Sequence, residues 1–134
     1  MKSNIVEISY TGHNFSASIS ILPGCVSIGT TPETIKKNIQ EAIFVHLAGM
    51  KEDGMAIPLS LKGKYQLVYK FETQSLLKYY HGIFTKAALE RITGINQRQL
   101  SHYSTGLKSP RKTQRDKIKK GLQKLGLELS TIDL

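Results

Sequence analysis

The sequence has one cysteine, no tryptophan and no long apolar run among its 134 residues. A single cysteine excludes a disulfide framework within the chain. No apolar stretch approaches the roughly 20 residues that a membrane-spanning helix needs, so no membrane partner is expected. The first residues, MKSNIVEISYTG, lack the longer apolar core of a signal peptide. We therefore expect a protein of the reducing cytoplasm.

Arginine is absent from residues 1–72, and the charge of the chain divides at the same place. Seven Lys against six acidic residues give residues 1–72 a charge of +1, whereas eight Lys and four Arg against four acidic residues give residues 73–134 a charge of +8. Together they make the +9 of the whole chain. Positive charge gathered in one segment is typical of a surface that neutralises phosphates. A nucleic-acid partner is therefore expected for the second segment.

Residues 1–72 show strand patterns interrupted by one long helical pattern. Thr31 followed by Pro32 marks the helix start, and apolar residues then recur at spacings of three and four as far as Asp53. This apolar stripe consists of Ile35, Ile39, Ala42, Ile43, His46, Leu47 and Met50. Strands are predicted at Ile5–Tyr10, Phe15–Ile21, Cys25–Gly29 and Tyr65–Phe71. The order β-β-β-α-β predicts a sheet with one face covered by the helix.

Residues 73–134 change to helical periodicity, which places a domain boundary near Glu72 and Thr73. Thr85 can cap a helix over Lys86–Thr93, and Asn96 can cap a second helix that ends at about Ser104. Gly94 supplies the tight turn between them. Outer helices are predicted at Gln74–His81 and Lys112–Leu125. The fold class expected is α+β, with a mixed domain at 1–72 and an all-α helix-turn-helix domain at 73–134.

The second helix of this pair has the pattern of a DNA-reading helix. Leu100 and Tyr103 share one face, whereas Arg98, Ser101, His102 and Thr105 point the opposite way. Gln and Arg side chains offer the paired groups that match adenine and guanine edges in the major groove. An exposed polar helix face is often simply solvated, but the concentrated positive charge favours a DNA-binding surface here.

Several short motifs resemble the N-terminal domain of HicB-type antitoxins. The run ILPGCVS at residues 21–27 precedes GTTPE at residues 29–33, and Asn38 and Glu41-Ala42-Ile43 follow in the helix. Asp53-Gly54 and Ile57-Pro58 resemble the family's segment after the helix. The resemblance covers residues 5–71, and the C-terminal part is similar to the Cro-type helix-turn-helix that many members append.

This resemblance implies a partial ribonuclease H-like sheet that binds and blocks a HicA-type toxin, a small RNA-cleaving protein. It also implies repression of the protein's own operon through operator double-stranded DNA. The base-contacting positions implied are Gln97, Arg98, Gln99 and His102, and the phosphate-contacting positions are Lys86, Thr105, Lys108, Arg111 and Lys112. A homodimer or a higher even-numbered homo-oligomer is expected, because one small helix-turn-helix domain covers only one half-site.

The chain departs from the family pattern in two places, one in the N-terminal domain and one within the helix-turn-helix. Ile21, Ile35 and Lys36-Lys37 stand where the family often has acidic residues, so attraction to a basic toxin would be weaker. The remaining candidates for toxin contact are Glu33, Glu41, Glu52 and Asp53. Glu90 replaces a small residue at a close helix crossing. Either the crossing opens, or Glu90 reaches outward to Arg91 or another basic neighbour.

Neither catalysis nor a cofactor or metal is expected. Ribonuclease H chemistry gathers carboxylates around a divalent metal, and Glu7, Glu33, Glu41 and Glu52-Asp53 do not clearly converge. The four histidines and Cys25 lack metal-ligand spacing, so partial burial is expected for His46 and a buried strand position for Cys25. Two rivals remain: a stand-alone transcription regulator whose first domain dimerises or senses a ligand, and a metal-dependent nuclease.

Overall fold

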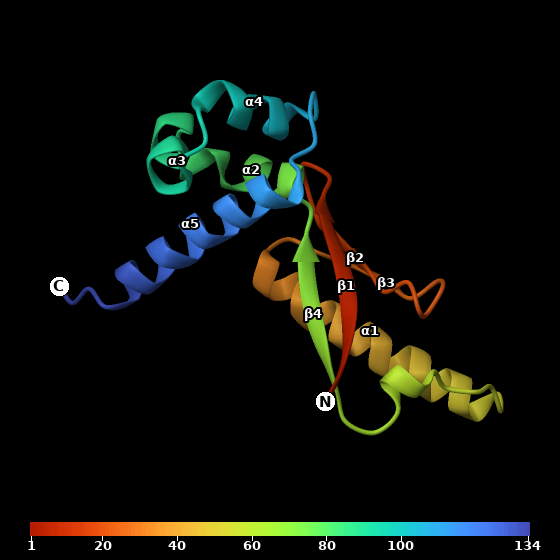
Figure 1. Cartoon of the computed structure of the whole chain (residues 1–134). Coiled ribbons are helices and arrows are strands. Elements are labelled where there is room, and N and C mark those ends of the chain that lie inside the picture. The colour runs from red at the N-terminus through yellow and green to blue at the C-terminus, as the bar shows by residue number, and fades with distance from the viewer. The chain divides into compact units, whose positions relative to one another are not determined.

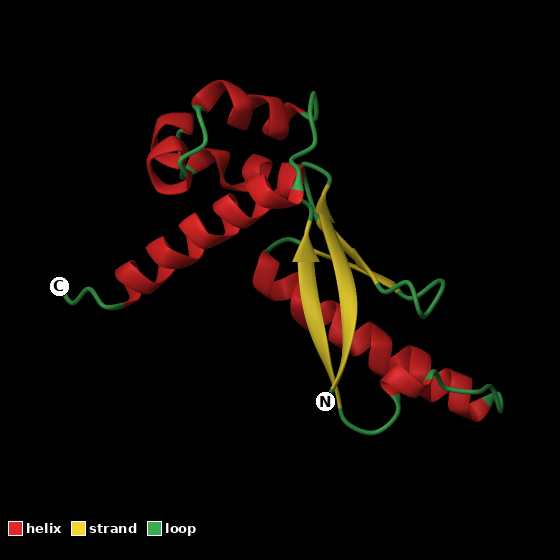
Figure 2. Cartoon of the chain, in the orientation of Figure 1, coloured by secondary structure: helices red, strands yellow, loops and turns green.

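The computed structural model describes all of residues 1–134, which divide into two compact units, Met1–Glu72 and Thr73–Leu134. The first unit contains four strands and a long helix, and the second contains helices only (Figures 1 and 2). The chain is therefore α+β, as the sequence predicts. None of its helices is both long and apolar enough to span a membrane.

The sheet of the first unit has the strand order β3-β2-β1-β4. Its strands are β1 (Lys2–Tyr10), β2 (Phe15–Ser18), β3 (Val26–Gly29) and β4 (Tyr65–Phe71). β2 is antiparallel to both neighbours, whereas β1 and β4 are parallel. β1 begins before the predicted Ile5 because its first residues pair with the start of β4. β2 ends before the predicted Ile21 because the Ile19 carbonyl accepts a hydrogen bond from Leu22 N in a turn.

Helix α1 (Pro32–Glu52) begins where the sequence predicts, since the Thr31 hydroxyl accepts a hydrogen bond of 3.0 Å from Thr34 N. Its buried stripe consists of Ile35, Ile39 and Ile43, and the stripe packs on β2 and β3. Other members of the predicted stripe, Ala42, His46, Leu47 and Met50, are half-buried. Gly29 permits this packing, because a Cβ there would lie 2.8 Å from Ile35 N. A short 3₁₀ turn, η1 (Leu59–Leu61), then leads back to the sheet.

The two faces of the sheet differ in burial. Val6, Ile8, Phe15 and Ala17 are buried on the face that α1 covers. Residues that alternate with them, including Ile5 and Glu7, are exposed on the opposite face. Cys25 is buried immediately before β3, and burial raises the pKa of its thiol.

The second unit packs its helices around one apolar core. Its helices are α2 (Thr73–Tyr79), α3 (Lys86–Thr93), α4 (Gln97–Thr105) and α5 (Lys112–Ser130), and the 3₁₀ turn η2 (Tyr80–Gly82) follows α2. The core comprises Leu77, Leu89, Ile95, Leu100, Tyr103 and Ile118. The prediction that the last helix ends at Leu125 is wrong. It continues to Ser130, because the following residues include good helix formers and no proline.

Candidate functional site

The pair of helices α3 and α4 is fixed by local hydrogen bonds at both starts and by glycine turns. The Thr85 hydroxyl accepts from Ala88 N at 3.0 Å, and the Asn96 side-chain oxygen accepts from Gln99 N at 2.8 Å. Gly94 has φ of 76°, a left-handed conformation that favours glycine. Both predicted caps are therefore confirmed. Leu100 and Tyr103 are buried, which turns the polar face of α4 outward.

Glu90 contributes a second acceptor at the start of α4. Its carboxylate accepts from Gln97 N at 3.2 Å and from Gln97 Nε2 at 3.4 Å. Of the two alternatives for Glu90, the one in which it reaches Arg91 or another basic neighbour is wrong, since its partner Gln97 is uncharged. The physical reason is that the first turn of a helix has unpaired N–H groups and a partial positive charge, which a carboxylate satisfies.

Of the four predicted base-contacting residues, Arg98 alone is exposed with a side chain that makes no hydrogen bond or ion pair in the chain. Gln97 is bonded to Glu90, and the half-buried Gln99 donates to the Tyr103 hydroxyl at 2.8 Å. His102 is half-buried, and its Nδ1 is buried without a hydrogen-bond partner. The two glutamines would therefore have to exchange internal bonds for contacts with a base.

The predicted phosphate contacts occupy the start of α3 and the loop after α4. Lys86 is the first residue of α3 and is half-buried. The Thr105 hydroxyl donates to the Ser101 carbonyl at 3.0 Å, so it is already engaged. Lys108 is exposed, and its N–H donates to the His102 carbonyl at 3.2 Å. This bond folds the loop back beside the last turn of α4.

The remaining predicted phosphate contacts lie at the start of α5. Arg111 is the exposed residue before the helix and makes no side-chain cap. Lys112 Nζ lies 4.0 Å from the Asp116 carboxylate, and the two side chains are 84% and 48% exposed, so this pair contributes little stability. Both cations therefore remain available to a ligand in solvent.

The outer surface of α1 carries the acidic residues predicted to contact a toxin, and we call this surface the α1 outer face. Glu33, Glu41, Glu52 and Asp53 are all exposed and make no ion pair. At about 100° per residue, Glu41 and Glu52 lie on the same side of the helix as Val45, with Phe44 beside them. Phe44 is 75% exposed and Val45 is 68% exposed.

The sequence analysis did not single out Phe44 and Val45. They follow Ile43 directly and do not fit the spacing of four residues that relates the buried residues Ile35, Ile39 and Ile43. That displacement was the signal that could have identified them, because an apolar residue outside the stripe has no core to enter. Exposed apolar side chains rimmed by polar groups are a common feature of protein interfaces.

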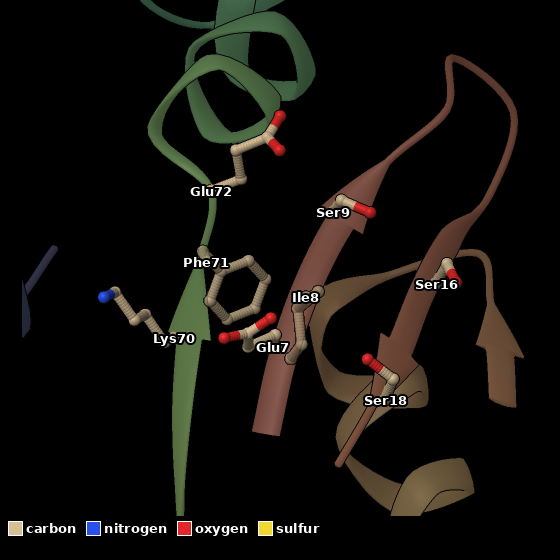
Figure 3. Close-up of a pocket in the computed structure, with 8 residues that line it drawn as sticks. All are labelled: Glu7, Ile8, Ser9, Ser16, Ser18, Lys70, Phe71 and Glu72. Atoms are coloured by element: carbon tan, nitrogen blue, oxygen red, sulfur yellow. The ribbon is translucent and has the colours of Figure 1, made fainter. Parts of the chain in front are cut away.

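A shallow pocket of about 330 Å³ lies on the sheet, between residues of β1, β2 and the end of β4 (Figure 3). Its lining consists of Glu7, Ile8, Ser9, Ser16, Ser18, Lys70, Phe71 and Glu72. Glu7 faces away from α1, so the carboxylates of α1 do not gather with it. Nowhere in the chain do three His, Cys, Asp or Glu side chains come together as metal ligands would.

Comparison with protein families gives a match to the first unit. Residues 4–75 match the family described as the HicB-like antitoxin of bacterial toxin-antitoxin systems. The match spans more than half of the 134 residues and includes α1, β2, β3, β4 and all of β1 except its first two residues. It stops within α2, before α3, α4 and α5. No curated protein matches the chain at a significant level.

Proposed function

Because the chain belongs to the HicB-like antitoxin family of bacterial toxin-antitoxin systems, we propose that residues 1–72 sequester a HicA-type RNA-cleaving toxin and that residues 73–134 bind operator DNA. In this proposal the protein represses its own operon as a homodimer or a higher even-numbered homo-oligomer. The observation that carries the proposal is the family match across the whole sheet unit. The antitoxin acts by occupying the toxin's surface and performs no chemistry.

The α1 outer face is the proposed toxin-binding surface. A toxin that binds RNA must present positive charge, and the exposed carboxylates of Glu41 and Glu52 are complementary to it. Phe44 supplies an exposed aromatic side chain beside them. Aromatic side chains enclosed by a polar rim commonly contribute most of the binding free energy of an interface.

The DNA-binding half of the proposal is supported by charge and by the arrangement of α4. The unit has a charge of +8, and Arg98 is exposed near the start of a helix whose other face is anchored by Leu100 and Tyr103. An arginine there could bind the O6 and N7 atoms of guanine with two hydrogen bonds. Lys108 and Arg111 would contact phosphates and fix the position of the helix.

Substitutions in the full chain can separate the two functions. Phe44→Lys places a positive charge on the α1 outer face, and we expect it to abolish inhibition of RNA cleavage by the purified toxin while operator binding is kept. Arg98→Ala should weaken operator binding and leave inhibition intact. Leu59→Lys is the matched control for Phe44→Lys, because Leu59 is 77% exposed in the same unit but lies in η1.

The outcomes of these measurements are distinct. Loss of inhibition with Phe44→Lys but not with Leu59→Lys would support the α1 outer face. Equal inhibition by both variants and the unchanged chain would rule that surface out. Failure of the unchanged chain to inhibit the toxin or to bind upstream DNA would reject the corresponding half of the proposal.

A further inference from the structure

The start of α4 is held by an acidic side chain of the neighbouring helix α3. Glu90 accepts two hydrogen bonds from Gln97, one from the backbone N–H at 3.2 Å and one from the side-chain Nε2 at 3.4 Å. Gln97 is the first residue of α4 and is exposed. A single carboxylate therefore holds both the backbone and the side-chain amide of a residue that is proposed to contact a base.

Glu90 is an exception in a strongly basic unit. Residues 73–134 contain eight Lys and four Arg but only four acidic residues, which are Glu90, Asp116, Glu128 and Asp133. Asp116 lies one turn from Lys112 in α5, and the last two acidic residues lie in the final turns of α5 or beyond it. Of the four, Glu90 alone hydrogen-bonds α4. Its negative charge therefore lies at the start of the helix that is proposed to enter the major groove.

A carboxylate at this point opposes DNA in two ways. The N-terminal residues of a recognition helix contact base edges in the major groove, so a negative charge there is repelled by the nearby phosphates. A glutamine reads adenine by donating an amide N–H to N7 and accepting from N6. The bond to Glu90 turns the Gln97 amide toward α3, and this bond must be broken before the amide reaches a base. Its loss offsets part of the free energy gained from adenine.

We propose that Glu90 is a specificity-determining residue that competes with operator DNA for Gln97. It binds the amide that adenine would bind, and its charge repels the phosphates beside α4. This inference rests on the proposed binding of operator DNA and adds to it a residue outside α4. Arg98 has no such competitor, because its exposed side chain makes no hydrogen bond or ion pair in the chain. Gln97 contributes to sequence reading only to the extent that a base displaces the carboxylate.

A double-mutant cycle in the full chain tests this inference. The unchanged chain, Glu90→Ala, Gln97→Ala and the double variant are titrated with a duplex from upstream of the gene and with a random duplex of the same length. The loss of affinity for the upstream duplex on Gln97→Ala should be at least about threefold greater when Glu90 is already alanine, because the amide is then free. Glu90→Ala alone should raise the affinity for random DNA by about threefold, since one negative charge leaves the phosphates.

Two further variants separate the position of the carboxylate from its charge. Glu128→Ala removes the same charge from an exposed residue near the end of α5, which Figure 1 shows extending away from α2, α3 and α4. It should change both affinities less than Glu90→Ala does. Glu90→Gln keeps the size and an acceptor oxygen but loses the charge, so its effect should be intermediate. Far-UV circular dichroism establishes that every variant is folded.

The possible results distinguish this inference from the proposed function. Equal losses on Gln97→Ala in both backgrounds, with the upstream duplex still bound, would overturn the inference and leave operator binding intact. A smaller loss in the Glu90→Ala background would also overturn it, because Glu90 would then orient Gln97 toward the base through the second N–H of the amide. If neither the unchanged chain nor Glu90→Ala binds the upstream duplex, the DNA half of the proposed function fails together with the inference. Binding gained only on Glu90→Ala would support the competition.

Discussion

Arg98 and Lys108 test two parts of the proposed DNA binding, namely recognition of the base sequence and attraction to the phosphate backbone. Both side chains are exposed cations of the second unit, but Arg98 lies in α4 and Lys108 in the loop that follows it. We expect Arg98→Ala to weaken specific binding by about 1–3 kcal/mol and to relax discrimination between bases. Lys108→Ala should weaken binding to every sequence and reduce the salt slope by about one.

Competition titrations of operator and random DNA at several salt concentrations measure both quantities. Gln97→Ala provides a further comparison, because its amide is bonded to Glu90 and must release that bond to reach a base. Gln97→Ala should therefore weaken specific binding less than Arg98→Ala does. Equal losses on operator and random DNA for Arg98→Ala would contradict its assignment as a base contact.

Two glycines of α5 differ in their surroundings, so substitution by alanine is expected to change the free energy of unfolding in opposite directions at the two positions. A Cβ at Gly121 would lie 2.3 Å from the Ile92 carbonyl oxygen, whereas a Cβ at Gly126 would meet nothing within 4 Å. Gly121→Ala should lower the free energy of unfolding by about 1–3 kcal/mol, because α3 and α5 must move apart. Gly126→Ala should raise it by about 0.5–1 kcal/mol, since alanine favours the helix.

Urea denaturation of the full chain, followed by circular dichroism, checks this pair. Each variant changes one glycine of the same helix, so the effect of helix propensity is matched between them. A Gly121→Ala variant as stable as Gly126→Ala would show that α3 and α5 do not approach each other closely at this point.

Among the elements, the helices with caps were the most predictable. Thr31, Thr85 and Asn96 each cap the helix that the sequence assigned to them, because a cap is a local interaction between residues three positions apart. The start of β1 was missed because it depends on pairing with β4, more than fifty residues later in the sequence. Such distant pairing has no local signal.

The candidate sites were predictable to a similar, partial extent. The polar face of α4 followed from its helical periodicity. The hydrogen bonds from Gln97 to Glu90 and from Gln99 to Tyr103 could not be predicted from the sequence, because they depend on where the side chains lie in three dimensions. Phe44 was missed because the helix stripe identifies residues that enter the core and leaves the outer surface undefined.

The cap of α4 gives a prediction at this scale. Asn96→Ala removes the acceptor of the Gln99 N–H and should destabilise the second unit by about 0.5–2 kcal/mol. Asn96→Ser is the control, because a serine hydroxyl can accept the same hydrogen bond. Thermal denaturation should rank the unchanged chain and Asn96→Ser above Asn96→Ala. If all three proteins have the same melting temperature, the Asn96 cap contributes no stability and Glu90 alone stabilises the start of α4.

At the scale of the whole molecule, the two units have different charges and are proposed to have different partners. We expect residues 1–72 alone to neutralise the toxin and residues 73–134 alone to fail, because a unit with a charge of +8 repels a basic protein. The measurement is RNA cleavage by the toxin with increasing amounts of each fragment. Circular dichroism must first show that each fragment is folded, since small units are marginally stable. Inhibition by the second fragment and not by a folded first fragment would reverse the assignment.

The parallel pairing of β1 with β4 has a consequence for the order of events during protein synthesis. The first strand made lies beside the last strand of its unit, so the sheet closes only after Phe71 has left the ribosome. Every strand of the proposed toxin-binding unit is then outside the ribosome, while the last part of residues 73–134 is still inside it or still to be made. At about 5–20 residues per second, residues 73–134 take roughly 3–12 s to make, counted from the moment Phe71 joins the chain. A nascent chain would therefore be able to capture toxin seconds before it could repress transcription.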